Sequence, residues 1–97
     1  MLYTVNASPT SSRSLESLLR VAAKGDPILL LEDGVHAARA GAATEKLAFA
    51  ALAAHPVYAL GPDLKARAIA HVIEGIRVIG YDGFVELVER HTVVPWV

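Results

Sequence analysis

Apolar and polar residues alternate in blocks along the chain, and these blocks predict strands and helices in turn. Short apolar runs predict strands, whereas apolar residues spaced three and four positions apart predict helices. The runs predict strands at residues 2–5, 28–31, 57–60, 76–79 and 93–97. The helical spacing predicts helices around residues 15–22, 35–54 with a break at Gly41, 62–72 and 83–91. Strands and helices therefore alternate from one end of the chain to the other.

The second predicted strand, Ile28 to Leu31, contains only large apolar residues. A strand of this kind is buried on both faces, as in a parallel sheet covered by helices. Strand–helix alternation leads to the same architecture. We therefore predict one α/β domain over residues 1–97, a flavodoxin-like three-layer α/β/α sandwich with a mostly parallel sheet of about five strands. Pro95 has no amide hydrogen, so the last strand is expected at an edge of the sheet.

The composition narrows the possible functions. Hydrophobic residues make up 54% of the 97 residues and charged residues 20%. This balance favours a chain that covers part of its surface with another chain, although core burial alone would also account for it. The net charge is −1 and the nine basic residues are scattered, so direct nucleic-acid binding is not expected. The chain has no cysteine, which excludes disulfides and thiolate chemistry on these residues.

Nothing in the sequence predicts a membrane segment. No apolar run approaches the roughly 20 residues that cross a bilayer. The first residues, MLYTVNASP, lack the basic and apolar regions of a secretory signal. We therefore expect no contact with a membrane and a cytoplasmic location.

Acidic residues follow three of the predicted strands, at the positions where open α/β sheets bind ligands. The sequences are Glu32-Asp33-Gly34, Gly61-Pro62-Asp63 and Gly80-Tyr81-Asp82. As a functional site they would form an acidic rim that binds a cation or a basic partner. We favour a structural interpretation, in which Asp33-Gly34 forms a turn and Asp63 and Asp82 lie at helix starts. Gly34 would be essential in this turn if its φ is positive.

Other candidate sites have less support. The Asn6–Ser14 loop is rich in hydroxyl groups, but it has no glycine with which to wrap a phosphate, so no cofactor is expected. Helical spacing allows Asp33 to meet His36 and Arg67 to meet His71, but two ligands do not make a metal site. No nucleophile elbow supports a Ser–His–Asp triad.

Trp96 is the one aromatic residue that is not expected simply in the core. It stands beside Pro95 in the last predicted strand. A tryptophan in this position either packs as a clasp against the domain or anchors an interface with another protein.

Four segments carry a resemblance that extends over essentially the whole chain. They are MLYTVNASP, GDPILLLEDGVHAA, VYALGPDLKARAIA, and VIGYDGFVELVERH followed by Trp96. The most specific pieces are LLLEDGV, VYAL followed by DLKAR, and YDGFVEL. In this order and spacing, the segments resemble the TusB/DsrH family of sulfur-relay subunits, within the DsrE/DsrF/DsrH-like superfamily.

The resemblance implies a function as well as a fold. Members of this family assemble with two homologous subunits, TusC-like and TusD-like, into a heterohexamer. The complex passes persulfide sulfur from a TusA-like donor toward a TusE-like acceptor, and in tRNA-modifying organisms the sulfur becomes the 2-thio group of the wobble uridine. The sulfur-carrying cysteine belongs to the TusD-like subunit. This chain, without cysteine, is therefore expected to be a noncatalytic subunit rather than an enzyme.

Several alternatives remain open. One is a DsrH-like subunit of a DsrEFH sulfur-oxidation complex. Some DsrH members have a cysteine in the first helix, where this chain has Ser17, Leu18, Leu19 and Ala22, and this difference favours the tRNA branch. A stand-alone nucleotide- or flavin-binding module rests on fold analogy alone, and a metal enzyme would use the acidic rim. When isolated, the chain could form a homo-oligomer through the surface that its partners cover.

Overall fold

The computed structural model describes residues 1–96 and contains one five-stranded parallel sheet. The strands are β1 (Leu2–Val5), β2 (Ile28–Leu30), β3 (Val57–Leu60), β4 (Arg77–Ile79) and β5 (Val93–Trp96). The helices are α1 (Ser14–Val21), the 3-10 helix η1 (Glu32–Ala38), α2 (Glu45–Ala54), α3 (Gly61–Ala66) and α4 (Tyr81–Arg90). The predicted strands agree with these to within one residue, and Val97 lies outside the described residues.

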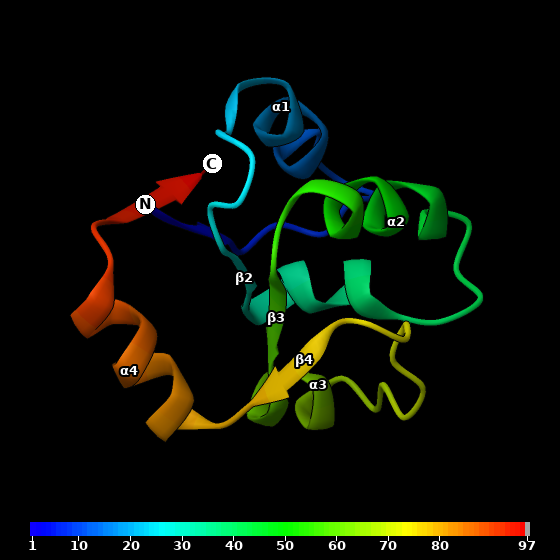
Figure 1. Ribbon diagram of the computed structural model, residues 1–97. Coiled ribbons are helices and arrows are strands. Elements are labelled where there is room, and N and C mark those ends of the chain that lie inside the picture. Colours follow the sequence, from blue (N-terminus) through cyan, green and yellow to red (C-terminus); the bar gives the residue numbers. More distant parts are fainter. Residues whose placement is uncertain (97) are drawn as a thin grey trace.

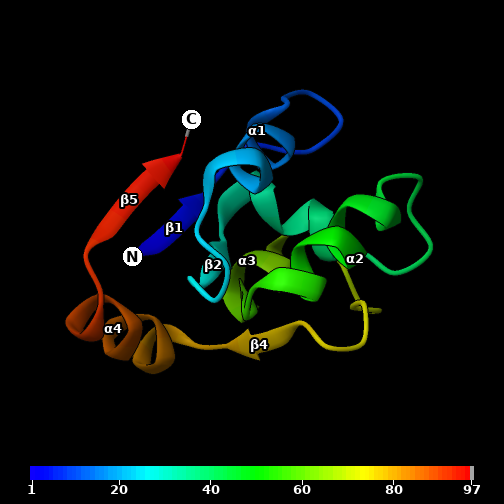
Figure 2. The same cartoon turned by 45° about the horizontal axis from the view of Figure 1, so that its top comes forward.

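The strands lie side by side in the order β4-β3-β2-β1-β5 (Figures 1 and 2). On one face of the sheet, Tyr3, Ile28 and Val57 form a row, because they are register partners across β1, β2 and β3. These residues belong to the main core cluster, to which α1, η1, α2 and α3 contribute. Their buried residues in the cluster include Leu18, Val35, Ala51 and Leu64. Four of the five helices therefore cover the same face.

The other face of the sheet meets α4. Its residues include Leu29 and Tyr58, which are register partners and alternate with the row above. Tyr58 and Ile79 line a hollow together with Gly83 and Leu87 of α4. Figures 1 and 2 show α4 on one side of the sheet and α1 and α2 on the other. The predicted flavodoxin-like α/β/α sandwich is thus confirmed, but one of its outer layers is a single helix within the described residues.

Two predicted helices differ from the observed ones. The segment expected as a broken helix over residues 35–54 is η1 followed by α2. The prediction for 62–72 was wrong beyond Ala66, because Ala68 adopts a left-handed φ of 54° and the chain continues irregularly. Ile69 and Ile73 are nevertheless buried, and the Ile73 N–H donates to the Ala38 carbonyl oxygen at 2.9 Å. Apolar spacing here predicted burial correctly but not backbone conformation.

All the helices are short. The longest of those described, α2 and α4, have ten residues each, about half of the roughly 20 that span a bilayer. Over residues 1–96, therefore, no helix combines the length and the apolar composition required to cross a membrane.

Trp96 ties the last strand to the first helix. Its strand, β5, pairs with β1 at the edge of the sheet, as Pro95 predicted. The indole Nε1–H donates to the Ser17 hydroxyl oxygen at 2.9 Å, and the ring meets Tyr3 edge-on with 6.0 Å between centroids. The half-buried side chain packs against the core cluster. Trp96 is thus packed as a clasp, and a further contact between Trp96 and a partner stays a prediction.

Gly34 lies where η1 passes over the end of β1. The expected positive φ is not at Gly34 but at Glu32, whose φ is 51°. Gly34 is required for a different reason, since a Cβ atom at this position would overlap the Val5 carbonyl oxygen. The same oxygen accepts a hydrogen bond of 3.1 Å from the Leu31 N–H. The Cβ atom would be fixed to the backbone of η1, and the oxygen belongs to the backbone of β1. The overlap can therefore be relieved only by shifting β1 or η1.

We predict that Gly34→Ala lowers the free energy of unfolding by at least about 2 kcal/mol, within the range of about 1–3 kcal/mol typical of overpacking. Gly80→Ala is the matched control, because Gly80 has a φ of −91° and open space around its Cβ position. We expect this control to lose less than about 1 kcal/mol. Urea unfolding followed by circular dichroism measures both variants. Equal losses would show that the contact with Val5 is not the constraint.

Candidate functional site

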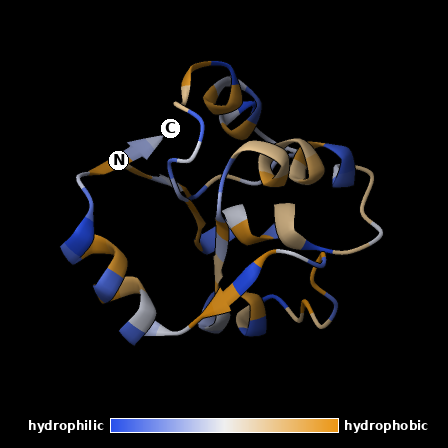
Figure 3. Ribbon diagram, in the orientation of Figure 1, coloured by the Kyte–Doolittle hydropathy of each residue, from blue (hydrophilic) through white to orange (hydrophobic). Residues whose placement is uncertain are grey.

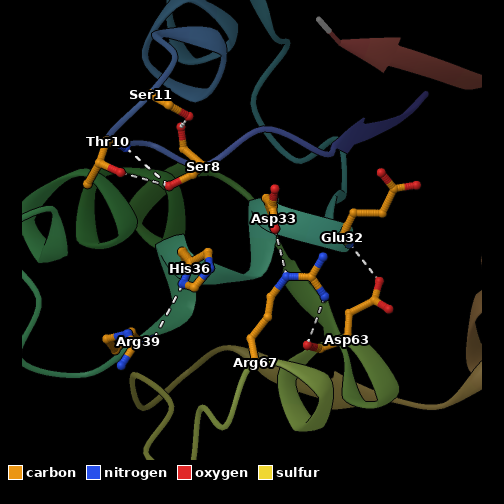
Figure 4. A network of polar contacts seen from close by, with 9 residues as sticks. All are labelled: Ser8, Thr10, Ser11, Glu32, Asp33, His36, Arg39, Asp63 and Arg67. Atoms are coloured by element: carbon orange, nitrogen blue, oxygen red, sulfur yellow. Dashed lines mark hydrogen bonds and ion pairs between the residues drawn. The ribbon is translucent and has the colours of Figure 1, made fainter.

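The segments that follow β1, β2 and β3 meet at the carboxyl edge of the sheet (Figure 4). They are the loop over residues 6–13, η1 and the beginning of α3. Parallel strands place these segments side by side, and ligands in open α/β sheets bind at this edge for that reason. The contacts of the acidic side chains at this edge therefore decide whether they are available to a ligand.

Asp63 holds the backbone at the start of η1. Its Oδ2 atom accepts a hydrogen bond of 2.6 Å from the Glu32 N–H. Glu32 has a left-handed φ of 51°, which costs a residue with a side chain about 1 kcal/mol or more. Asp63 lies in the first turn of α3, as predicted, but its carboxylate binds the neighbouring helix η1 rather than its own helix.

Arg67 connects the same two helices from the end of α3. Its Nε atom donates to Asp33 Oδ1 at 2.8 Å, and its Nη1 atom donates to the Asp63 carbonyl oxygen at 3.2 Å. The Asp33 side chain is 63% exposed, so this ion pair contributes at most about 1 kcal/mol. Asp33 and Asp63, two of the three aspartates of the predicted rim, are thus brought together around one arginine.

Asp82 takes no part in this network. α4 begins at Tyr81 with Gly80 as its N-cap residue, and Asp82 is exposed in the first turn. Asp82 thus lies at the helix start, but no side chain, Asp82 included, caps α4 in the part of the chain that the structure describes. An acidic residue in the first turn still interacts favourably with the helix dipole.

Helical spacing suggested the pairs Asp33–His36 and Arg67–His71, and the structure shows other pairs instead. Asp33 pairs with Arg67, which comes from a different helix. His36 Nδ1 lies 3.4 Å from Arg39 Nη2 instead. The Asp33–Arg67 pair joins residues 34 positions apart and so depends on the tertiary fold, whereas His36 and Arg39 are only three positions apart.

The remaining histidine interactions are structural. His55 is buried, and its Nδ1 atom lies 2.9 Å from the Asp26 carbonyl oxygen, at the turn before β2. Among the side chains of residues 1–96, no three His, Cys, Asp or Glu residues lie close enough to hold a metal ion.

The hydroxyl-rich loop folds around Ser8. The Ser8 carbonyl oxygen accepts hydrogen bonds from the N–H groups of Ser11 and Ser12 at 3.1 and 3.0 Å. The Ser8 hydroxyl lies 2.9 Å from the Thr10 hydroxyl. These bonds close a tight turn without glycine, as serine and threonine often do.

The Asp33–Arg67–Asp63 network fits a role in holding η1 and α3 in place. The Asp33 and Asp63 carboxylates are both engaged by groups of the same chain. Sequence reasoning offered His71 as the partner of Arg67 and missed its contacts with Asp33 and Asp63, although its position four residues after Asp63 was a weak signal for a helical pair. It also missed the left-handed Glu32, for which no local pattern gave a signal.

Comparison with known sequences identifies relatives over nearly the full length. Residues 7–94 match the family described as DsrH like protein. Protein TusB of Serratia proteamaculans is 49% identical, with 94% of each chain covered. Protein TusB of Pectobacterium carotovorum is 43% identical, again with 94% of each chain covered.

Solved structures show the same fold. The ychN protein of E. coli superposes with a TM-score of 0.82 at 19% identity, covering 98% of this chain and 97% of that one. MTH1491 of Methanobacterium thermoautotrophicum, a protein of unknown function, gives a TM-score of 0.74 at 13% identity, covering 97% and 96%. These two similarities concern the fold alone. The family match and the two TusB relatives go further and show that this chain belongs to the DsrH-like, or TusB/DsrH, family.

Proposed function

We propose that this chain is a noncatalytic subunit of a cytoplasmic sulfur-relay complex that passes persulfide sulfur for 2-thiolation of the wobble uridine of tRNA. The observation that carries the proposal is its similarity to TusB proteins over 94% of its length, at 49% and 43% identity. The DsrH-type role in a sulfur-oxidation complex requires the same kind of subunit and differs in the acceptor of the sulfur.

The chain lacks the group that a sulfur carrier needs. Persulfide transfer requires a thiolate that accepts a sulfur atom, and none of the 97 residues is cysteine. The carboxylates at the strand ends hold η1 and α3 together. A role in assembly with a TusC-like and a TusD-like subunit is consistent with both features, and it requires a surface that partners can cover.

The helix α4 provides such a surface, because three of its large apolar side chains face away from the sheet. The residues that line the hollow between α4 and the sheet recur every three or four positions: Gly83, Glu86, Leu87 and Arg90. The large apolar residues with the same spacing on the opposite side are Tyr81, Val85 and Val88. Their exposed fractions are 61%, 52% and 41%. We call these three residues the α4 stripe.

An outward apolar stripe is unusual for a lone domain, whose surface helices turn their apolar side toward the core. Figure 3 shows hydrophobic residues along α4 among hydrophilic ones. The exposed acids Asp82 and Glu89 border the stripe on one side by helical geometry. The stripe therefore fits a partner surface that is apolar at its centre and basic beside it. We assign this surface to a homologous subunit of the heterohexamer.

The first test is assembly. We predict that co-expression with TusC-like and TusD-like proteins of the same genome yields one complex that contains all three chains, with the mass of a heterohexamer. Mass spectrometry under native conditions and light scattering measure it. Partners that are soluble but do not co-purify with this chain would contradict the proposal.

The second test concerns the α4 stripe. We predict that Val85→Asp weakens the complex at least about 100-fold. The substitution removes a valine whose burial by the partner would contribute about 1.5–3 kcal/mol, and it places a charge in the interface. Val21→Asp on α1 is the matched control, since Val21 is 62% exposed and lies apart from the stripe, and it should leave assembly intact. Circular dichroism of the isolated variants checks folding. Equal binding by the two variants would exclude α4 from the interface.

The third test concerns the acidic rim. We predict that Asp33→Asn keeps 2-thiouridine in cellular tRNA within about twofold of the wild-type level, because an exposed ion pair contributes at most about 1 kcal/mol. Liquid chromatography of tRNA nucleosides from a complemented deletion strain measures this level. A loss as large as that caused by deleting the subunit would mean that Asp33 acts in the transfer itself.

A further inference from the structure

A hollow separate from the Asp33–Arg67 pair lies at the carboxyl edge of the sheet, between the loop after β1 and η1. Its volume is about 280 Å³. Three segments supply its polar lining, which consists of Ser8, Thr10, His36, Arg39 and Thr44. Figure 4 shows Ser8 and Thr10 on one side and His36 and Arg39 on the other. The hydroxyl-rich loop, which the proposed function does not use, thus forms one wall of a small pocket.

The polar groups of this pocket have hydrogens to donate. Arginine is a donor only, so in the 3.4 Å contact with Arg39 the His36 Nδ1 atom is the acceptor. In this tautomer the hydrogen is on Nε2, from which it can be donated to a ligand. The Ser8 and Thr10 hydroxyl oxygens lie 2.9 Å apart, and whichever donates, the other keeps its hydrogen. Imidazole, guanidinium and hydroxyl donors therefore surround one space.

Carboxylates do not compete for these donors. None of the residues that line the pocket is acidic. The nearby acids are engaged elsewhere, since Asp33 accepts from Arg67 and Glu45 Oε2 accepts from the Gly41 N–H at 2.7 Å. Over the described span of 1–96, Arg39 forms no ion pair with a carboxylate. A guanidinium among neutral donors attracts an anion.

We propose that this pocket binds a small tetrahedral oxyanion of the phosphate class, with Arg39 and His36 as its principal donors. A guanidinium matches two oxygens of such a group. Pockets that enclose drug-sized ligands measure about 300–1,000 Å³, so 280 Å³ suits a phosphate group better than a whole nucleotide or flavin. The site uses neither the α4 stripe nor sulfur transfer, so its test is independent of the proposed function.

An NMR titration of the full chain with inorganic phosphate at constant ionic strength tests the proposal. We expect saturable shifts of the His36 ring signals and of the Thr10, Arg39 and Thr44 amides, with a dissociation constant in the millimolar range. A parallel titration with glycerol 3-phosphate distinguishes the source of the group. Tighter binding of the ester indicates the end of a larger metabolite, and tighter binding of phosphate indicates the free anion.

Arg39→Gln should weaken binding by about tenfold or more, because it removes a charged hydrogen-bond donor. Arg20→Gln is the matched control, since Arg20 is an exposed arginine on α1 that pairs with Glu16, and it should change binding less than about twofold. The spectra themselves report folding. Shifts that do not saturate, or equal weakening by both variants, would overturn the proposal.

Discussion

The right-handed sense of parallel crossovers is the constraint on which this fold depends. The chain moves from β1 to β4 through neighbouring positions, so the three connections lie on one face of the sheet. β5 pairs with β1 at the far edge, and the last connection must therefore run back across the whole sheet. The same handedness then places α4 on the opposite face. Within the described residues, one ten-residue helix serves that entire face, and no further helix covers its outer side, where Tyr81, Val85 and Val88 are exposed.

The polar network at the carboxyl edge follows from the same topology. Adjacent parallel strands end side by side, so η1 and α3 begin close together and can exchange hydrogen bonds. Asp63 stabilises the left-handed Glu32, and Arg67 draws Asp33 to the end of α3. These residues are of types that catalyse reactions in other proteins, yet here their partners belong to the same chain. A carboxylate at a strand end is thus a poor indicator of chemistry until its hydrogen bonds are known.

The sequence was sufficient to predict the strands, because runs such as Ile28–Leu30 have no polar residue that would allow exposure. It was insufficient where backbone geometry depends on distant contacts. Gly34 was expected to be essential if its φ is positive, but the close approach of the Val5 carbonyl oxygen, 29 residues away in the sequence, is what requires it. The helix predicted beyond Ala66 is absent from the described residues for a similar reason. The Ile73 N–H donates to the Ala38 carbonyl oxygen, and the His71 carbonyl oxygen accepts from the Ala40 N–H. In a helix, these backbone groups would have bonded within the segment itself.

The 3-10 helix η1 links the structural network to the anion pocket, and this link bears on how the pocket could bind. The N-terminal end of η1 is fixed by the Gly34–Val5 contact and by Asp63. Its C-terminal end carries His36 and is followed by Arg39. A helix of seven residues transmits its position from one end to the other, so the backbone that carries His36 and Arg39 is placed before a ligand arrives. Preorganisation lowers the entropic cost of binding. Asp63 and the Gly34–Val5 contact thus act on the proposed anion pocket by fixing the start of η1, although they are not among the residues that line it.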